Sequence, residues 1–174
     1  MLFRSPAYHT FSPGAEYLPL FEHVAPKGAT VLDAGCGAGA GSLALKAAGY
    51  QVQAFDISSA GLTEDFKASG IPFTQGSLWS PHTSLPTVDW CYCTDVMEHI
   101  PQVYVGLVID RLLRSAQQVF FSIGLTPDHF GVWVGRPLHL TVQGFAEWRN
   151  LFRELGRVEE ARDLLNTGIY VVTR

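Results

Sequence analysis

The sequence predicts an α/β protein built from parallel β-α-β units, and two observations carry this prediction. Five short apolar runs have the length and composition of buried strands, at residues 29–33, 51–55, 71–74, 88–93 and 118–123. Helix-like stretches lie between several of these runs, at residues 40–48, 58–69 and 103–115. Strands and helices that alternate at these lengths imply right-handed parallel crossovers, with both faces of the sheet covered.

The elements of the first half follow from local residue chemistry. An apolar pattern at residues 14–24 suits a short amphipathic helix, although Pro19 leaves its start open. The strand at 51–55 ends at Asp56, after which Ser58 or Ser59 can cap the next helix. The third crossover is a loop rich in Ser, Thr and Pro, so that part of the sheet is expected to be thinly covered.

The regular alternation of strands and helices ends after Gly124. A long connection runs to about Leu140, and it is followed by a predicted helix at residues 143–155 and by strands at 157–161 and 169–173. Connections of that length are unusual unless they are functional or mobile. This connection is therefore a candidate functional segment.

Length and composition indicate one globular domain. The chain has 174 residues, of which 47% are apolar and 16% charged. We divide it into an N-terminal lid or helix (1–28), a cofactor-binding core (29–123) and a substrate-side part (124–174). No signal-peptide pattern or membrane-length apolar run is present, so a cytoplasmic protein without a membrane partner is expected. Three cysteines are too few and too unevenly spaced for a disulfide framework or zinc site: Cys36, Cys91 and Cys93.

The charge balance argues against a protein that binds nucleic acid mainly by electrostatics. The formal net charge is −4, whereas such binding depends on many Lys and Arg contacts to phosphate. Every basic residue after Lys67 is an arginine, but these arginines are interleaved with acids, as on solvated helix faces. A local cluster of basic residues beside the site would still be compatible with nucleic-acid binding.

A glycine loop follows the first predicted strand. Asp33 ends the strand, and Gly35, Gly37 and Gly39 lead into a helix, which presents backbone beside unpaired helix N–H groups. This pattern alone also fits a dinucleotide fingerprint or a tight turn without a ligand. A carboxylate before the first glycine favours a ligand with a cationic amino group over a pyrophosphate. Asp56 suits ribose hydroxyls in either cofactor, so it does not discriminate.

Three motifs in this order resemble class I S-adenosylmethionine-dependent methyltransferases: VLDAGCGAG, AFDIS and CTDVMEHIP. The resemblance covers nearly the whole chain. It implies a single-domain, Rossmann-like α/β/α sandwich with a mostly parallel seven-stranded sheet and an antiparallel last strand. It also implies S-adenosylmethionine as the methyl donor and S-adenosylhomocysteine as the product.

The resemblance further implies which residues contact the cofactor. The methionine part would be surrounded by Asp33, Gly35, Cys36 and Gly37. Asp56 would bind the ribose, and Ile57 would pack on the adenine. Near the adenine amino group the family usually has an acid, but this chain has Ser77, between Gly76 and Leu78. The sulfonium would lie over Thr94, Asp95 and Val96.

Asp95, Glu98 and His99 form a second candidate cluster. Their i, i+3, i+4 spacing would place all three on one side of a helical turn, at the sheet edge where ligands bind. Three interpretations stay open. Glu98 and His99 are a structural pair, His99 is a general base for the acceptor, or a divalent metal is held by Asp95, Glu98, His99 and His139.

The metal interpretation draws on a further resemblance. Small-RNA 3′-end methyltransferases and ubiquinone-pathway O-methyltransferases have an acid-x-x-Glu-His turn paired with a distant histidine before an aromatic helix. Here His139 precedes Phe145 and Trp148, and Asp95 stands where glutamate is usual, which shortens the reach of that ligand. The candidate catalytic residues are therefore His99, Glu98 and His139.

The acceptor itself is not encoded in a recognisable motif. Aromatic and cationic residues of the long connection could hold a planar acceptor, or simply cover the sheet edge: His129, Phe130, Trp133, Arg136 and His139. The segment before residue 24 could fold over the cofactor, with Tyr8, His9 and Tyr17 as lid candidates. We predict an O- or N-methyltransferase for a small molecule or glycan precursor. The alternatives are a metal-dependent methyltransferase for nucleic-acid ends, a non-catalytic S-adenosylmethionine-binding module and a nicotinamide oxidoreductase.

Overall fold

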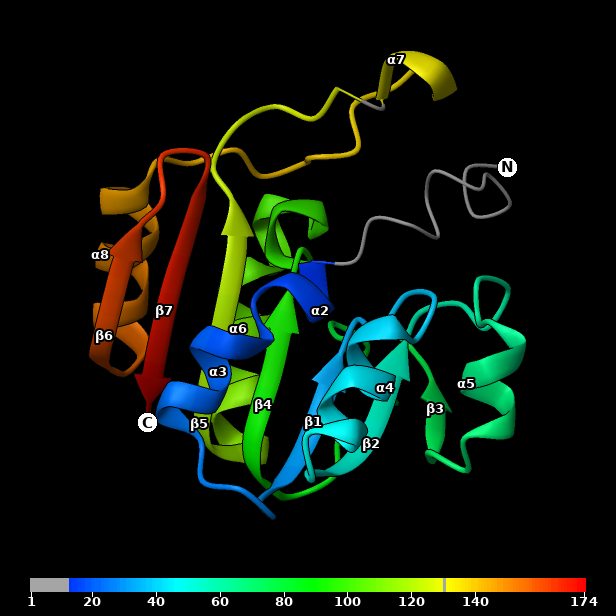
Figure 1. Cartoon of the computed structure of the whole chain (residues 1–174). Coiled ribbons are helices and arrows are strands. Elements are labelled where there is room, and N and C mark those ends of the chain that lie inside the picture. Colours follow the sequence, from blue (N-terminus) through cyan, green and yellow to red (C-terminus); the bar gives the residue numbers. More distant parts are fainter. Residues whose placement is uncertain (1–12, 130) are drawn as a thin grey trace.

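A computed structural model describes residues 13–129 and 131–174 of the chain (Figure 1). In these residues the strands form one sheet of seven, in the order β3-β2-β1-β4-β5-β7-β6. Their bounds are β1 (Thr30–Ala34), β2 (Gln51–Asp56), β3 (Phe73–Gln75), β4 (Val88–Thr94), β5 (Ala116–Gly124), β6 (Arg157–Asp163) and β7 (Thr167–Thr173).

The sheet has the topology that the sequence predicts. Strands β1 to β5 pair in parallel, and β7 lies antiparallel between β5 and β6. The chain order therefore reverses at β1, which lies between β2 and β4. In open α/β sheets the crevice outside the carboxyl ends of the strands at such a switch point is where ligands bind.

Alternation along the strands builds two apolar layers, one on each face of the sheet. On β4, Trp90 and Tyr92 pack with helices α3 (Leu18–Val24), α4 (Ala40–Ala47) and α5 (Glu64–Ala68). Cys91 and Cys93 face the other way, toward α6 (Gln102–Ser115) and α8 (Phe145–Leu155). Helices thus cover both faces, as parallel sheets require (Figure 1). None of the helices in the described ranges is long and apolar enough to cross a membrane.

Two helices differ from the prediction. The helix expected at 58–69 is only α5, because Thr63 caps it by accepting a hydrogen bond from the Phe66 N–H at 3.2 Å. Ser58 instead accepts from the Ala60 N–H and forms a turn of its own. The helix expected at 14–24 is broken at Tyr17 into α2 (Pro13–Glu16) and α3. Proline in the first turn of α3 explains that restart.

The third crossover has no helix, as the sequence predicts. Residues 76–87 form a loop between β3 and β4. The Arg111 guanidinium on α6 donates hydrogen bonds to the backbone carbonyls of Ser80 and Thr83. Arg111 therefore ties this loop to α6.

Candidate active site

The glycine loop lies at the switch point, between β1 and α4. The N–H groups of Gly35 and Cys36 donate to the Phe55 carbonyl of β2, at 2.7 and 3.0 Å. Gly35, Gly37 and Gly39 all have positive φ angles, of 88°, 54° and 91°. The loop is therefore folded back against β2 by its own backbone, and residues with a Cβ rarely adopt these angles.

At two of these glycines, neighbouring side chains leave no room for a Cβ. A Cβ at Gly35 would collide with Val96, and one at Gly39 would collide with the Phe66 ring. Glycines in such a loop are expected where a ligand approaches the backbone closely. In the structure, backbone conformation and close side-chain packing already account for Gly35 and Gly39.

Asp33 ends β1 beneath the loop and is 2% exposed. Its carboxylate accepts a 2.5 Å hydrogen bond from the Ser42 hydroxyl on α4. Burial raises the pKa of Asp33 to about 7, the Ser42 hydrogen bond opposes this, and the nearby negative charge of Asp56 adds to it. A cationic group bound at the loop would favour the ionised carboxylate, which is the role that the sequence predicts.

Asp56 ends β2 with its carboxylate turned toward the glycine loop. One oxygen accepts from the Gly37 N–H and the other from the Ser58 N–H, both at 2.9 Å. A carboxylate has about four lone-pair sites, so capacity for two hydroxyl donors remains. Ile57 follows with 58% of its surface exposed, which is unusual for an isoleucine beside a core strand and leaves an apolar side chain for a planar ring.

The predicted adenine-side residues divide into two groups. Leu78 is 5% exposed and packs in the α6-side core. The Ser77 hydroxyl is buried and has no hydrogen-bond partner among the described atoms. A buried hydroxyl without a partner is unfavourable, and a ligand amino group would supply one. Gly76 joins them to β2 through a 2.9 Å bond from its N–H to the Asp56 carbonyl.

Beyond β4 the chain turns sharply at Asp95. Thr94 is buried, Asp95 is exposed with a φ angle of 58°, and Val96 packs against Gly35. Non-glycine residues in this conformation are strained and cluster at functional sites. Asp95 therefore lies outside the short 3-10 helix η2 (Met97–His99), and the expected helical turn starting after Cys93 is wrong.

Glu98 is turned into the protein, with its carboxyl close enough to Asp95 for that charge to act on it. It is fully buried, and its Oε1 accepts a hydrogen bond from the Gly124 N–H at the end of β5. Its Oε2 is buried, and no described residue forms a hydrogen bond with it. Burial, and next the charge of Asp95, raise the pKa of Glu98 well above its ordinary value. Asp95 is not helical, so these side chains come together through the turn at Asp95 rather than through helical spacing.

His99 and His139 come together although forty residues separate them. Their rings are 4.9 Å apart and nearly perpendicular. Ligand atoms of Asp95, His99 and His139 all lie within 4.8 Å of one another. The N–H groups of Leu140 and Thr141 donate to the Glu98 carbonyl, at 2.7 and 3.0 Å, and this pairing carries His139 to its place.

Both imidazoles are oriented by backbone carbonyls. His99 Nδ1 lies 3.0 Å from the Leu138 carbonyl oxygen, and His139 Nδ1 lies 2.6 Å from that of Thr126. A carbonyl oxygen only accepts, so each Nδ1 carries a proton, and in the neutral ring the lone pair is then on Nε2. In that tautomer Nε2 can bind a metal or accept a proton.

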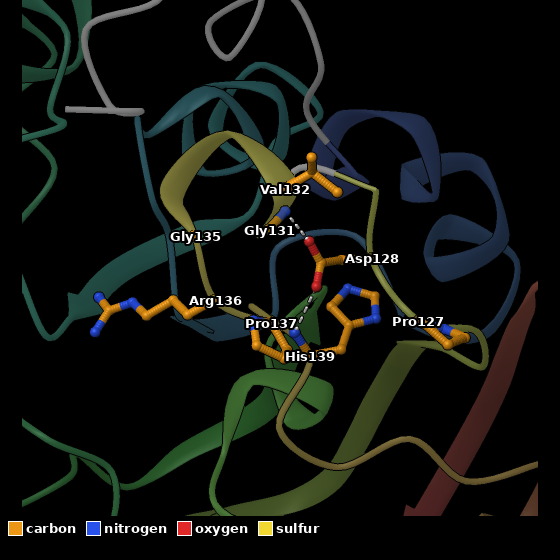
Figure 2. Close-up of a pocket in the computed structure, with 8 residues that line it drawn as sticks. All are labelled: Pro127, Asp128, Gly131, Val132, Gly135, Arg136, Pro137 and His139. Atoms are coloured by element: carbon orange, nitrogen blue, oxygen red, sulfur yellow. Dashed lines mark hydrogen bonds between the residues drawn. The ribbon is translucent and has the colours of Figure 1, made fainter.

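The long connection surrounds an open hollow of about 370 Å³ that includes His139 (Figure 2). It is lined by residues around α7 (Gly131–Val134), namely Pro127, Asp128, Gly131, Val132, Gly135, Arg136, Pro137 and His139. Drug-sized ligands occupy cavities of roughly 300–1,000 Å³. Of the residues predicted here, His129 is exposed, Trp133 falls in α7, and Phe130 lies outside the described residues.

Asp128 also lies in this connection, and it is not among the site residues predicted from the sequence. Its carboxylate accepts hydrogen bonds from the N–H groups of Gly131, Leu138 and His139. Desolvation raises the pKa of Asp128, but these donors outweigh it, so the pKa lies below its ordinary value. An aspartate followed three residues later by glycine is a turn signal that could have marked it.

The N-terminal lid prediction is tested only in part, because Tyr8 and His9 lie outside the described residues. Helix α2 packs directly on the start of α4, where a Cβ on Gly41 would lie 3.1 Å from Gly14 Cα. The Tyr92 hydroxyl donates to the Gly14 carbonyl at 2.8 Å, and the Tyr17 hydroxyl donates to Thr167 Oγ1 at 3.2 Å. Tyr17 therefore ties this segment to β7.

The fold and the loop together define a Rossmann-like protein with a glycine loop at the switch point, and solved structures share this fold. The PH0226 protein of Pyrococcus horikoshii superposes with a TM-score of 0.78 and 17% identity, over 98% of this chain and 92% of that one. An S-adenosylmethionine-dependent methyltransferase of Mesorhizobium loti gives 0.71 and 16%, over 92% and 98%. Magnesium protoporphyrin IX methyltransferase of Synechocystis, with bound S-adenosylhomocysteine, gives 0.65 and 20%, over 92% and 80%.

The sequence itself supplies the family. Residues 8–159 match the family described as "Methyltransferase domain", so the chain belongs to that family. A comparison with curated proteins gives no match. Family and fold together confirm the predicted resemblance to class I methyltransferases.

Proposed function

We propose that this protein binds S-adenosylmethionine at the glycine loop and methylates an oxygen or nitrogen atom of a small molecule or glycan precursor. Membership of the methyltransferase family supports the reaction class, and the S-adenosylhomocysteine bound to the Synechocystis structure supports the cofactor. When bound, the cofactor supplies an electrophilic methyl group on a sulfonium. The chain then needs chiefly to align the acceptor, and alignment can contribute about 7–11 kcal/mol.

Four features of the switch point fit this cofactor. The buried Asp33 carboxylate favours a cationic amino group nearby, and Asp56 retains acceptor capacity for ribose hydroxyls. Ile57 exposes an apolar side chain, and the Ser77 hydroxyl lacks a partner. A dinucleotide would place a pyrophosphate at this loop, next to the Asp33 carboxylate. That repulsion argues against a nicotinamide cofactor.

The observation that carries the acceptor proposal is the convergence of three electron-pair donors, with a buried carboxyl group nearby. Asp95, His99 and His139 offer ligand atoms within 4.8 Å of one another, and Glu98 Oε2 is buried with no hydrogen-bond partner among the described residues. Both imidazoles keep a lone pair on Nε2, and the charge of Asp95 acts on Glu98. Carboxylates and lone pairs held together this way repel one another unless a proton or a metal cation lies among them.

We infer that the cation is a divalent metal held by Asp95, Glu98, His99 and His139. Carboxylates and imidazoles are the ligands of such ions, and the backbone carbonyls on both Nδ1 atoms supply the usual outer contacts. A metal there would act as a Lewis acid toward an acceptor oxygen. The cavity that includes His139 would hold the rest of the acceptor.

Charge distribution favours a small acceptor over a nucleic acid. Arg114, Arg157 and Arg162 pair with Asp110, Glu159 and Glu160. Arg111 is engaged with the loop carbonyls, and Arg136 lines the cavity, where its side chain extends away from Asp128 and His139 (Figure 2). Nucleic-acid binding usually needs a basic surface, and these pairings leave few arginines free to form one.

The cytoplasmic location and the division of the chain at residues 28 and 123 stay predictions.

The central experiment measures S-adenosylhomocysteine release from a panel of acceptors, with Mn²⁺ or Mg²⁺ and with excess EDTA. We expect turnover that depends on the metal. The substitutions Asp95→Asn and Glu98→Gln should abolish it while S-adenosylhomocysteine still binds, because asparagine tolerates the Asp95 conformation and glutamine keeps an acceptor for the Gly124 N–H. Asp163→Asn in the β6–β7 turn is the control. Full activity in excess EDTA would refute the metal.

Two further outcomes separate the remaining alternatives. If His99 acts as a general base, His99→Ala should lower the rate mainly near neutral pH, and an unchanged pH profile would exclude that role. His129→Ala is the matched control, because His129 is an exposed histidine that is not part of the cluster of Asp95, His99 and His139. Tight binding of S-adenosylhomocysteine without turnover of any acceptor would instead support a non-catalytic module.

A further inference from the structure

One side chain bridges two stretches of the connection between β5 and α8. The Asp128 carboxylate accepts from the Leu138 N–H at 2.7 Å and from the His139 N–H at 3.1 Å, and it also accepts from the Gly131 N–H. Figure 2 shows it between Gly131 and His139. These bonds join two stretches of chain that lie ten residues apart. Most of this connection is exposed, so apolar packing contributes little to its shape.

The joined stretches are the ones that orient both site histidines. Leu138 receives the Asp128 bond through its N–H and accepts from His99 Nδ1 through its carbonyl. His139 receives a bond at its N–H, and its Nδ1 lies against the carbonyl of Thr126, two residues before Asp128. If Asp128 releases the connection, both carbonyls lose their fixed positions relative to the rings.

We propose that Asp128 is a positioning residue that fixes the tautomer and orientation of His99 and His139. Its carboxylate is committed to three backbone donors, and it acts on the rings through the carbonyls of Leu138 and Thr126. An imidazole without such a carbonyl populates both tautomers, and the one protonated on Nε2 has no lone pair facing the site. This inference rests on the proposed function for its consequence in catalysis, but the tautomer itself can be measured without turnover.

The test uses Asp128→Asn in the full-length protein. One carboxylate oxygen is replaced by an NH₂ group, which cannot accept and would face a backbone N–H. We expect nitrogen chemical shifts at alkaline pH, where imidazoles are neutral, to show both rings protonated on Nδ1 in the wild type and mixed in the variant. His99→Asn and His139→Asn assign the signals. Removing outer contacts of metal-binding histidines costs about 10–100-fold in affinity or activity, so Mn²⁺ binding should weaken by that factor.

Two controls make the result specific. Asp163→Asn removes a carboxylate that holds another turn, by accepting from the Leu165 N–H at 2.9 Å, and should leave both tautomers unchanged. Asp128→Glu restores an acceptor and should recover part of the wild-type tautomer. Affinity for S-adenosylhomocysteine should stay within twofold in all three variants, since Asp128 lies outside the glycine loop.

The possible results either support the positioning role of Asp128 or overturn it. Unchanged tautomers in Asp128→Asn overturn the inference, and so does loss of S-adenosylhomocysteine binding, which would mean a general structural role. Shifted tautomers with retained cofactor binding support it. If the wild type turns over no acceptor but the tautomers shift, the proposed function fails while the positioning role stands.

Discussion

Replacing Asp33 with asparagine should have opposite effects on stability and on cofactor binding. The Asp33 carboxyl is 2% exposed, and its pKa of about 7 lies well above the ordinary value of 3.8. An acid whose pKa is raised by folding binds its proton more tightly in the folded state. Its ionisation therefore destabilises the protein, starting near pH 4 and reaching the full effect above pH of about 7.

The size of this effect follows from the pKa shift. A rise of about three units at 1.36 kcal/mol per unit corresponds to about 4 kcal/mol of lost stability at alkaline pH. Asparagine is uncharged and its amide oxygen can still accept from Ser42, so Asp33→Asn should recover most of it. For a chain of this length the melting temperature of the ligand-free protein would rise by about 10 °C at pH 8 and hardly change at pH 4.

The same substitution, Asp33→Asn, should weaken cofactor binding. If a cationic amino group favours ionised Asp33, binding to the wild type must first remove the proton at acidic pH. The affinity for S-adenosylhomocysteine should then fall about 20-fold between pH 7.5 and 5.5, following the ionised fraction of a group with a pKa of about 7. Asp33→Asn should bind weakly at both pH values.

Calorimetric titration and scanning calorimetry of both proteins across this pH range test the reasoning. Ser42→Ala removes the hydrogen bond that lowers the pKa of Asp33 and should move the wild-type transition to higher pH. Equal melting temperatures for the wild type and Asp33→Asn at pH 8 would refute the argument from burial. An affinity independent of pH in the wild type would refute the electrostatic link to the cofactor.

Three other predictions concern the frame of the site. Gly35→Ala should lower stability by about 1–3 kcal/mol in urea unfolding, and Gly35→Ala with Val96→Ala should recover only the part due to the collision, since the positive φ remains. Equal stability of the single and double variants would show that Val96 is not the obstacle. Tyr92→Phe should cost about 0.5–1.5 kcal/mol by removing the bond to the Gly14 carbonyl, and hydrogen exchange should rise in α2 but not in α6. Arg111→Met should expose residues 76–87 to proteolysis while the melting temperature changes little, and continued protection of that loop would contradict the role given to Arg111.

Much of the fold was accessible from local sequence patterns. Apolar runs and small-residue helices identified the parallel strands, and the glycines after Asp33 located the ligand loop, because strand and turn preferences act over a few residues. The helix expected at 58–69 was misjudged because three nearby hydroxyl residues could cap it and only packing selected Thr63. The antiparallel last strand came from the family resemblance, since strand order depends on contacts far apart in the chain.

The sequence by itself determined the class of protein, its glycine loop and the identity of the acids and histidines in the candidate site. The tertiary structure decided how they are used. It turned Glu98 inward beneath Gly124 and buried Asp33, and it brought His139 to His99 through backbone pairing at Glu98. Residue type fixes which chemistry a side chain offers, whereas burial and long-range hydrogen bonds fix its direction, protonation and neighbours, and these arise only when distant segments pack together.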